Sequence, residues 1–594
     1  MKKNLILFFT ALLVGSTTAN AQFGMLKNLA GGGKAGKKSG NFQTVWESEF
    51  DNKASRIALS NSDGSIIIGT DDNSATVLNA EGKQVWSGDY KKLTTNKTNN
   101  SEFQYVIKGD KSGYLFLFDA RTIGADRVAV LDLTSGKELW NSEAYQDLLD
   151  KKEAEADIET VKYINELDAF LIAQRGGLSM VEAKTGKQLW TTKTFKGSVG
   201  KYLYDKKTNQ ILMLNYKPTF WSALFSAFKN QLVKINALNG EIIWDAEFRG
   251  TIEKKLITRE PLVDLTIKGD KLFLWLDGLQ AYDINSGKKL WDVAYENDMD
   301  QAKKSILGIG GRGSKGVYGT LAEPVYTNDA VYLAMFGNGN KTKFIEKHDL
   351  NTGKLLWTSE KITGAYCLPH IYVTGDKLMV QVGGKVEVQE ISTHRGANGM
   401  VTKYKISNEY MNQKNGLLAL NAGTGQSLWR SDKFDKRITD MVIHRDKTVF
   451  AGDGDEFFAY DIATGNQKFV VKHNDAKVGK ATDVIDFGDD VVVISEKGLA
   501  SYKKENGTRN YATSKLAEIT NFYLVGDNYF LQSQTDSKNI FYGIDMTTGE
   551  MKGSVTSKGK GGSPKYGDGI DITDDGEYIF AFNGKKVEKI KVNN

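Results

Sequence analysis

The stretch His348–Trp357, HDLNTGKLLW, decides the fold of this chain. It contains the end of one strand, a polar turn at Asn351–Gly353, and a second strand that ends in Trp357. Glycine accepts positive φ at no steric cost, so a polar pair followed by glycine between two apolar runs specifies a hairpin turn. The pattern therefore predicts two antiparallel strands with a tryptophan at a fixed point on the second strand.

The same pattern recurs along the chain, in most cases at intervals of roughly 40 to 54 residues. Further copies with a glycine four residues before a tryptophan are Leu78–Trp86, Leu131–Trp140, Val181–Trp190, Ile235–Trp244, Tyr282–Trp291 and Leu420–Trp429. Degenerate copies, in which Phe, Tyr and Gly replace the tryptophan, are Tyr460–Phe469, Tyr502–Tyr511 and Ile544–Gly553. Repeats of this period, each one small antiparallel sheet, are the signature of a β-propeller. We therefore predict an all-β fold, a β-propeller of four-stranded antiparallel blades.

The two ends of the chain carry incomplete repeats. Residues Phe42–Trp46 resemble an outgoing, Trp-bearing strand without its incoming partner, whereas Lys586–Val592 follows the turn Asn583-Gly584 and has no outgoing strand. We expect the two ends to share one blade, because a closed ring has no exposed sheet edge.

With this shared blade, eight blades end at a tryptophan and three more are degenerate. Eleven blades exceed the usual four to eight of one ring. We therefore expect about eight or more blades in one ring or two: either some repeats are not blades, or the chain makes two rings with a division near residues 306–319. The shared ends favour a single closed structure.

Residues 1–21 have the pattern of a secretory signal peptide, with Lys2 and Lys3, the apolar run Leu5–Val14, and small residues up to Ala21. The run is shorter than the about 20 residues that span a bilayer. No cysteine follows the expected cleavage site, so we expect no lipid anchor and a periplasmic or secreted protein. Residues 22–41 form a Gly/Lys-rich linker, and residues 42–594 are expected to form the propeller region.

The composition fits a large β protein and excludes some functions. The chain has 594 residues, with 61 Gly and only 5 Pro, as expected for many tight hairpins. Cys367 is the only cysteine, so no intrachain disulfide can form. The net charge of +5 is too small to indicate a nucleic-acid partner. We find no apolar run long enough for a transmembrane segment.

Few residues in the sequence suggest a catalytic, metal-binding or ligand-binding site. The five histidines lack metal-ligand spacing, and acidic turns such as Asp453–Asp455 do not fit the 12-residue calcium loop. Residues Gly308–Gly316 contain a G-x-G-x-x-G match without the βαβ context that a dinucleotide site needs. We expect a flexible loop there, with an anion nest at Arg312 and Lys315 as the alternative. The sequence predicts no catalytic residue, no metal site and no cofactor.

Two insertions depart from the repeat. In Tyr216–Gln231, large apolar residues fall at i, i+3, i+4 and i+7, the spacing of one helix stripe; they are Trp221, Leu224, Phe225 and Phe228. Two alternatives stay open: the stripe packs on the propeller as a lid, or it binds a partner or, through residues 219–229, a membrane surface. The second insertion, Ser392–Gln413, is polar and is expected to form an extended loop.

The repeated pattern of an acidic residue or Asn, then Thr/Ser-Gly-Lys-x-Leu-Trp, resembles the pyrroloquinoline-quinone-like (PQQ-like) propeller repeat, over nearly all of the chain after its N-terminal segments. The resemblance implies that the tryptophans dock on the neighbouring blade and tie the ring together. Each would bury on the order of 200 Å². The residues concerned are Trp46, Trp86, Trp140, Trp190, Trp244, Trp291, Trp357 and Trp429.

This repeat occurs in two functional classes, so the fold alone does not choose between them. One class is the quinone-dependent dehydrogenases, many of which have adjacent cysteines and a calcium ion bound by Glu, Asn and Asp. The other is the non-catalytic propellers, exemplified by the periplasmic accessory subunit of the outer-membrane β-barrel assembly machine. The solitary Cys367 and the lack of an assignable calcium set favour the second class.

We therefore expect a non-catalytic exported propeller that serves as a protein-binding or scaffolding module, with a cell-envelope protein as its partner. A PQQ-dependent quinoprotein oxidoreductase is one alternative. A glycan-binding or glycan-cleaving propeller is another.

Overall fold

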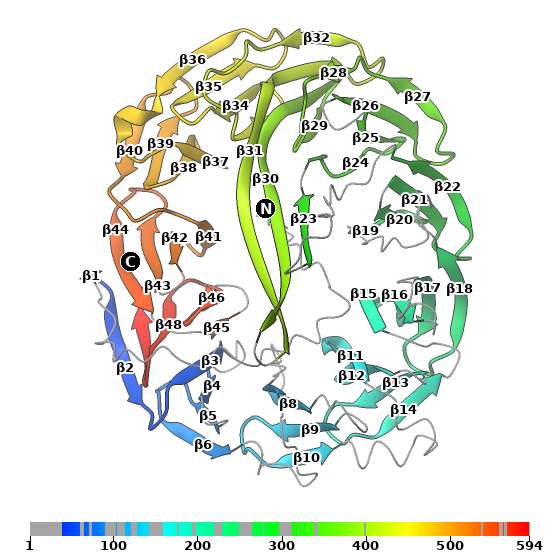
Figure 1. The fold of residues 1–594 in the computed structure, drawn as a ribbon, viewed down its shortest axis with the longest axis vertical. Helices are drawn as coiled ribbons and strands as arrows, with labels where there is room; N and C mark the ends of the chain where they lie inside the picture. The colour runs from blue at the N-terminus through cyan, green and yellow to red at the C-terminus, as the bar shows by residue number, and fades with distance from the viewer. Residues whose placement is uncertain are drawn as a thin grey trace.

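The structure is a computed structural model, and it describes residues 39–59, 64–70, 74–89, 102–103, 113–119, 127–141, 158–174, 177–192, 198–218, 228–248, 264–276, 278–295, 312–318, 320–337, 342–396, 399–535, 538–557, 562–563 and 567–592. Within these ranges the strands form eleven four-stranded antiparallel blades in one ring (Figure 1). The all-β propeller predicted from the repeat is confirmed. In each blade the first strand lies toward the centre of the ring and the fourth at its periphery (Figure 1).

The first five blades after the N-terminal strands are as follows: β3–β6 (Ala54–Leu59, Ile66–Thr70, Ser74–Leu78, Gln84–Asp89), β7–β10 (Glu102–Phe103, Tyr114–Asp119, Arg127–Asp132, Glu138–Asn141), β11–β14 (Ile158–Ile164, Ala169–Gln174, Gly177–Glu182, Gln188–Thr192), β15–β18 (Ser198–Asp205, Gln210–Pro218, Phe228–Asn236, Ile242–Phe248) and β19–β22 (Asp264–Lys268, Lys271–Leu276, Gly278–Asp283, Lys289–Ala294).

The next five are as follows: β24–β27 (Val325–Tyr326, Ala330–Phe336, Thr342–Asp349, Leu355–Thr358), β29–β32 (Ile371–Thr374, Lys377–Gly396, Gly399–Asn421, Ser427–Arg430), β33–β36 (Asp440–His444, Thr448–Gly452, Glu456–Asp461, Gln467–Lys472), β37–β40 (Ala481–Phe487, Asp490–Ser495, Gly498–Lys503, Arg509–Thr513) and β41–β44 (Asn521–Val525, Asn528–Thr535, Lys538–Asp545, Met551–Ser557). Short additional elements are β23 (Arg312–Tyr318), β28 (Ile362–Thr363), β45 (Gly562–Ser563), β46 (Gly567–Asp568) and the 3₁₀ helices η1 (Asn165–Leu167) and η2 (His473–Ala476).

The two ends of the chain close the ring, as predicted. Strand β2 (Gln43–Glu49) pairs with β49 (Lys586–Lys591), which completes a blade with β47 (Ile570–Ile572) and β48 (Tyr578–Asn583). Just before β2, strand β1 (Ser39–Gly40) pairs with β44, the outer strand of the preceding blade. The N-terminal segment therefore joins two blades, and it does so at their outer edges.

The motif tryptophan of one blade contacts the motif turn of the next. The indole Nε1 of Trp140 donates to the carbonyl of Ala183 at 2.8 Å, and a Cβ built at Gly186 would lie 2.6 Å from Cγ of Trp140. Two features require glycine at position 186. Its φ is +71°, which side chains disfavour, and the indole of Trp140 occupies the space that a side chain would need. Equivalent indole bonds join Trp46 to Ala80, Trp86 to Leu133, Trp190 to Ala237, Trp244 to Ile284, Trp291 to Leu350, Trp357 to Ala422 and Trp429 to Ile462.

The two faces of the ring differ. The third and fourth strands are joined by five residues in every blade except the closing one, as in 350–354 between β26 and β27. Because strands alternate in direction, the connections between second and third strands, and those between blades, leave from the opposite face. These include 16 residues between β10 and β11 and 15 between β18 and β19. We call the two sides the turn face and the insertion face.

Three segments differ from the sequence expectations. Residues 312–318 form strand β23 rather than a loop, and Ser392–Gln413 lies in the paired strands β30 and β31. Phe228 begins strand β17 and pairs with Pro218, so it does not lie on a helix. In each case pairing with an adjacent strand supplies backbone hydrogen bonds that spacing alone does not reveal. Trp221, Leu224 and Phe225 lie outside the described residues, as do residues 1–38.

Candidate functional site

The longest departure from the repeat is the hairpin of β30 and β31, which have 20 and 23 residues. The pairing between them continues to Gly396 and Gly399, and β23 pairs with β30 along Glu387–Thr393. This three-stranded sheet, which we call the hairpin sheet, runs from its blade across the centre of the ring in Figure 1. The hairpin connects the second and third strands of its blade, so it belongs to the insertion face. Sequence reasoning missed it, although Gly396 and Gly399 marked its turn.

The base of the hairpin sheet, at Lys385 and Tyr410, contacts the two blades that follow its own blade, β33–β36 and β37–β40. We call this part of the hairpin sheet its root. Nζ of Lys385 on β30 lies 2.8 Å from Oδ1 of Asp483 on β37. The guanidinium of Arg437 lies 3.6 Å from the ring centroid of Tyr410 on β31, and its Nη2 lies 3.3 Å from Oε1 of Glu496. Burial acts to lower the pKa of Lys385, but the Asp483 carboxylate outweighs it and the pKa is raised. These contacts hold the hairpin at a defined position on the ring.

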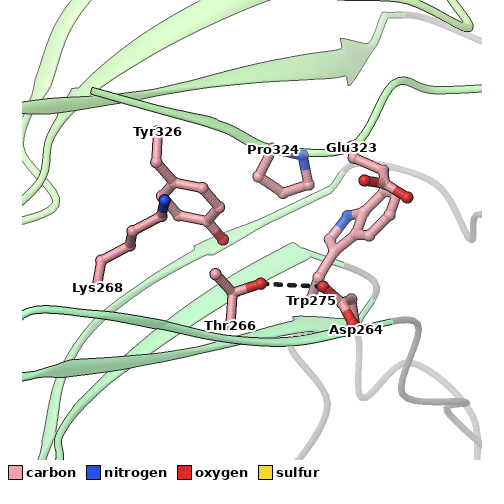
Figure 2. A pocket seen from close by; sticks show the side chains of 7 residues that line it. All are labelled: Asp264, Thr266, Lys268, Trp275, Glu323, Pro324 and Tyr326. Atoms are coloured by element: carbon pink, nitrogen blue, oxygen red, sulfur yellow. Dashed lines mark hydrogen bonds between the residues drawn. The ribbon is translucent and has the colours of Figure 1, made fainter. Parts of the chain in front are cut away.

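A cavity of about 180 Å³ lies between blades β19–β22 and β24–β27 (Figure 2). Its lining residues are Asp264, Thr266 and Lys268 of β19, Trp275 of β20, and Glu323, Pro324 and Tyr326 in or just before β24. Alternate residues of a strand face the same side, so Asp264, Thr266 and Lys268 all face the next blade. We call this space the Asp264 cavity.

The Asp264 cavity exists because the facing strand is short. Strand β24 has two residues, whereas β19 has five. Pro324, directly before β24, has no N–H to continue the pairing. Further upstream, Leu321 forms a bridge to Leu368, which precedes the next blade. The half of the innermost strand that would fill the junction is therefore missing, and Glu323 is exposed at its rim.

Two polar groups that line the cavity donate hydrogen bonds to defined partners. Thr266 Oγ1 donates to Asp264 Oδ2 at 2.9 Å, and the indole Nε1 of Trp275 donates to the hydroxyl of Tyr295 at 2.9 Å. Burial, together with the charges of Asp264 and Glu323, raises the pKa of Tyr326 well above its ordinary value. Tyr326 therefore stays neutral. Figure 2 shows Asp264 and Glu323 beside Trp275, with Lys268 beside Tyr326 on the other side.

A second cavity, of about 260 Å³, lies on the insertion face of blade β33–β36 and is mostly acidic. Its lining includes Asp435, Lys436, Asp453, Asp455, Glu456, Lys472, Asn474 and Asp475. The buried Asp453 accepts the backbone N–H groups of Asp455 and Glu456 at 3.0 and 2.7 Å, so one of its oxygens stabilises a turn. Nζ of Lys436 lies 3.5 Å from Oδ2 of Asp455. The acidic groups thus belong largely to the local turn structure.

The structure places two of the sequence-predicted site residues on one strand. Arg312 and Lys315 lie on β23, where their backbones pair with Thr393 and Glu390. Cys367 is fully buried, and burial raises the pKa of its thiol to about 12. Among the described residues, no group of three or more His, Cys, Asp and Glu side chains could hold a metal ion. The described ranges also contain no helix that is long and apolar enough to cross a membrane.

The comparisons with known proteins agree with this architecture. The sequence profile of the family described as "Outer membrane protein assembly factor BamB" matches residues 39–210, 222–322 and 277–552, which is most of the chain. The chain belongs to this family. The expected PQQ-like repeat of the outer-membrane-assembly type is thereby confirmed.

Three solved structures are similar at low sequence identity. BamB from Moraxella catarrhalis is 15% identical, with a TM-score of 0.29, and the match covers 67% of this chain and 92% of that one. The computationally designed Ika8 protein is 13% identical, with a TM-score of 0.34 and coverage of 68% and 100%. A eukaryotic initiation factor is 9% identical, with a TM-score of 0.35 and coverage of 75% and 98%. No match is found among curated proteins.

Proposed function

We propose that this protein is a non-catalytic binding propeller of the cell envelope, and that its insertion face docks another envelope protein. The observation that carries the proposal is the asymmetry of the ring. In ten blades a five-residue turn joins the third and fourth strands on one face, whereas the connections of 12 or more residues between blades, and the hairpin sheet, leave from the other face. Insertions on a rigid scaffold are where binding residues concentrate. Membership of a family described by an outer-membrane assembly factor supports the envelope location.

The attachment of the hairpin sheet also supports a binding role. Its root is held by the Lys385–Asp483 ion pair and by the packing of Arg437 on Tyr410. A binding element that is ordered before the partner arrives loses less conformational entropy on association. The hairpin sheet therefore suits the positioning of a partner across the ring.

The two alternative functions have less support. Many quinone-dependent dehydrogenases of this repeat type have adjacent cysteines, whereas Cys367 is the only cysteine of this chain. A glycan site would use aromatic and carboxylate side chains together, as Trp275, Asp264 and Glu323 occur in the Asp264 cavity. However, that cavity of about 180 Å³ is smaller than the about 300 to 1,000 Å³ of usual small-molecule sites. A single side chain fits this space better than an oligosaccharide.

Site-specific photo-crosslinking tests the proposal. A benzophenone amino acid would replace Lys436 or Asn474 on the insertion face, and Asn351 or Thr547 on the turn face as matched controls. All four positions are exposed. We expect both insertion-face positions to crosslink the same envelope protein and both turn-face positions to capture none of it. Equal capture from the two faces would contradict the proposal.

A shortened hairpin gives a second, independent test. Val388 and Ser407 are cross-strand partners, so an Asn-Gly turn can replace residues 389–406 between them. We expect the thermal melt of the ring to stay close to that of the unaltered protein, while crosslinking from Lys436 and Asn474 is lost. Full crosslinking by the shortened protein would show that the hairpin sheet is not part of the docking surface.

A further inference from the structure

We propose that the Asp264 cavity binds one cationic side chain, a lysine ammonium or an arginine guanidinium, from a partner segment that lies on the insertion face. The identity of the partner rests on the proposed function. The chemistry of the cavity does not, because it follows from the residues that line it.

The size of the cavity limits the ligand. A space of about 180 Å³ is below the usual range for cofactors and drug-sized ligands, which starts near about 300 Å³. It lies beside the innermost strands, where β24 is shorter than β19. A long side chain with a compact charged end can enter such a space while its backbone stays outside. The ligand is therefore one side chain of a larger molecule.

The lining selects a positive charge. Two carboxylates, Asp264 and Glu323, lie in the lining with the aromatic side chains of Trp275 and Tyr326. Carboxylates form their strongest hydrogen bonds with ammonium and guanidinium groups, and the faces of Trp and Tyr attract the same cations. The N–H of Trp275 is already bonded to Tyr295, so this residue offers its ring rather than a donor. An anionic ligand would face both carboxylates.

The position of Lys268 also indicates that the cavity prefers a cation. Its Nζ lies 5.9 Å from the ring centroid of Tyr326, so a cation of this chain already stands beside that ring. Lys268 is exposed and lies at the opposite end of β19 from Asp264. An incoming cation would be repelled by it. Removal of the Lys268 charge should therefore strengthen binding, which a purely structural role of the cavity would not produce.

The test uses the purified chain and short peptides as probes. Saturation-transfer NMR would compare acetyl-Gly-Lys-Gly-amide and acetyl-Gly-Arg-Gly-amide with matched peptides that carry Nε-acetyl-lysine or citrulline. We expect only the charged peptides to bind. Glu323→Gln and Asp264→Asn should each weaken binding about tenfold, the effect of one charge-assisted hydrogen bond. Lys268→Gln should strengthen it about threefold.

Asp270→Asn is the matched control, because Asp270 is an exposed carboxylate of the same blade in the turn between β19 and β20, on the turn face. It should leave peptide binding unchanged. Equal binding of charged and neutral peptides, or the same loss in Asp270→Asn as in Glu323→Gln, would overturn the inference. So would binding of a neutral oligosaccharide in place of the charged peptides.

The inference and the proposed function can fail separately. If the charged peptides bind as expected but no envelope protein crosslinks to Lys436 or Asn474, the cavity assignment stands and the docking proposal falls. If crosslinking is specific to the insertion face but no charged peptide binds, the docking proposal stands and the cavity assignment falls.

Discussion

The ring of Phe42 lies over Gly543, so closely that a Cβ built at Gly543 would be 2.7 Å from Cζ of Phe42. Phe42 stands four residues before Trp46, the position that glycine holds in the other motifs. Gly553, in turn, stands where the other motifs have an aromatic residue. The closing blade has no turn between β49 and β2, because these strands come from the two chain ends. An aromatic at position 553 would find no turn to dock on, and Phe42 fills the junction instead.

Phe42→Ala should therefore weaken the junction between the closing blade and blade β41–β44. Phe42 is 6% exposed and packs with Phe530, Phe541 and Val555, so its loss should cost about 3 to 5 kcal/mol. Denaturant melts followed by circular dichroism measure the shift. Val45→Ala, at a side chain that is 51% exposed, is the control and should cost less than about 0.5 kcal/mol. An equal, small effect of both changes would show that the N-terminal segment does not contribute to closure.

The motif contact predicts a coupled pair of substitutions. Trp140 is 4% exposed, and Trp140→Ala should cost about 3 to 5 kcal/mol if the indole ties two blades together. Gly186→Ala should also destabilise the protein, because a methyl group would overlap the indole and the φ of +71° disfavours alanine. In the double variant the overlap disappears, so the two costs should not add. Strict additivity in the denaturant melts would argue that the residues act independently.

Much of the fold could be predicted because the repeat is both local and periodic. The turn glycine and the tryptophan four residues later are set by φ and by packing within one hairpin and its neighbour, and both are visible in the sequence. The closure could be predicted from Phe42–Trp46 and Lys586–Val592, each of which lacks a partner strand. The insertions were less predictable, because β23 and the hairpin sheet depend on pairing between segments that are far apart. Helical spacing around Phe228 was outweighed by the same kind of pairing.

The Asp264 cavity could not be predicted from the sequence. Its two sides are almost 60 residues apart, and none of its residues forms a recognisable motif. The cavity forms because β24 has only two residues, Val325 and Tyr326. The pairing of β24 with β25 shows how short this strand is, and the sequence alone does not. Pro324 was the one available signal, because proline within a strand pattern marks an edge or an end.

The root of the hairpin sheet should respond to loss of one carboxylate. Asp483→Asn removes the charge that faces Lys385, so the hairpin should open more often while the blades stay folded. Hydrogen exchange measured by mass spectrometry should show faster exchange in peptides from β30 and β31. Asp376→Asn is the control, because Asp376 pairs with Lys377 at 2.7 Å but lies in the turn before β30, outside the root. Unchanged exchange in Asp483→Asn would mean that strand pairing alone holds the hairpin.

The motif turns predict how the stability of the ring depends on pH. Asp349 Oδ1 accepts the hydroxyl of Thr352 at 2.8 Å and the N–H groups of Thr352 and Asn351 at 2.8 and 3.0 Å. The Thr352 hydroxyl and then its N–H lower the pKa of Asp349 below its ordinary value of 3.8. A lowered pKa in the folded state means that the ionised carboxylate stabilises the fold. This contribution is complete above pH 3.8 and is lost as the pH falls through the folded pKa.

In blade β29–β32, the motif turn has an asparagine where blade β24–β27 has Asp349. Asn421 stands at the position of Asp349, and its Oδ1 accepts the N–H groups of Gly423 and Thr424 at 2.9 Å each. Asp349→Asn should therefore keep the turn but lose its pH dependence. The melting temperature of this variant should lie below that of the unaltered protein near about pH 6 and should approach it as the pH falls through the folded pKa of Asp349. Asn421→Asp should do the reverse, with a gain near about pH 6 that disappears in acid. Parallel pH profiles for all three proteins would show that these carboxylates do not couple ionisation to folding.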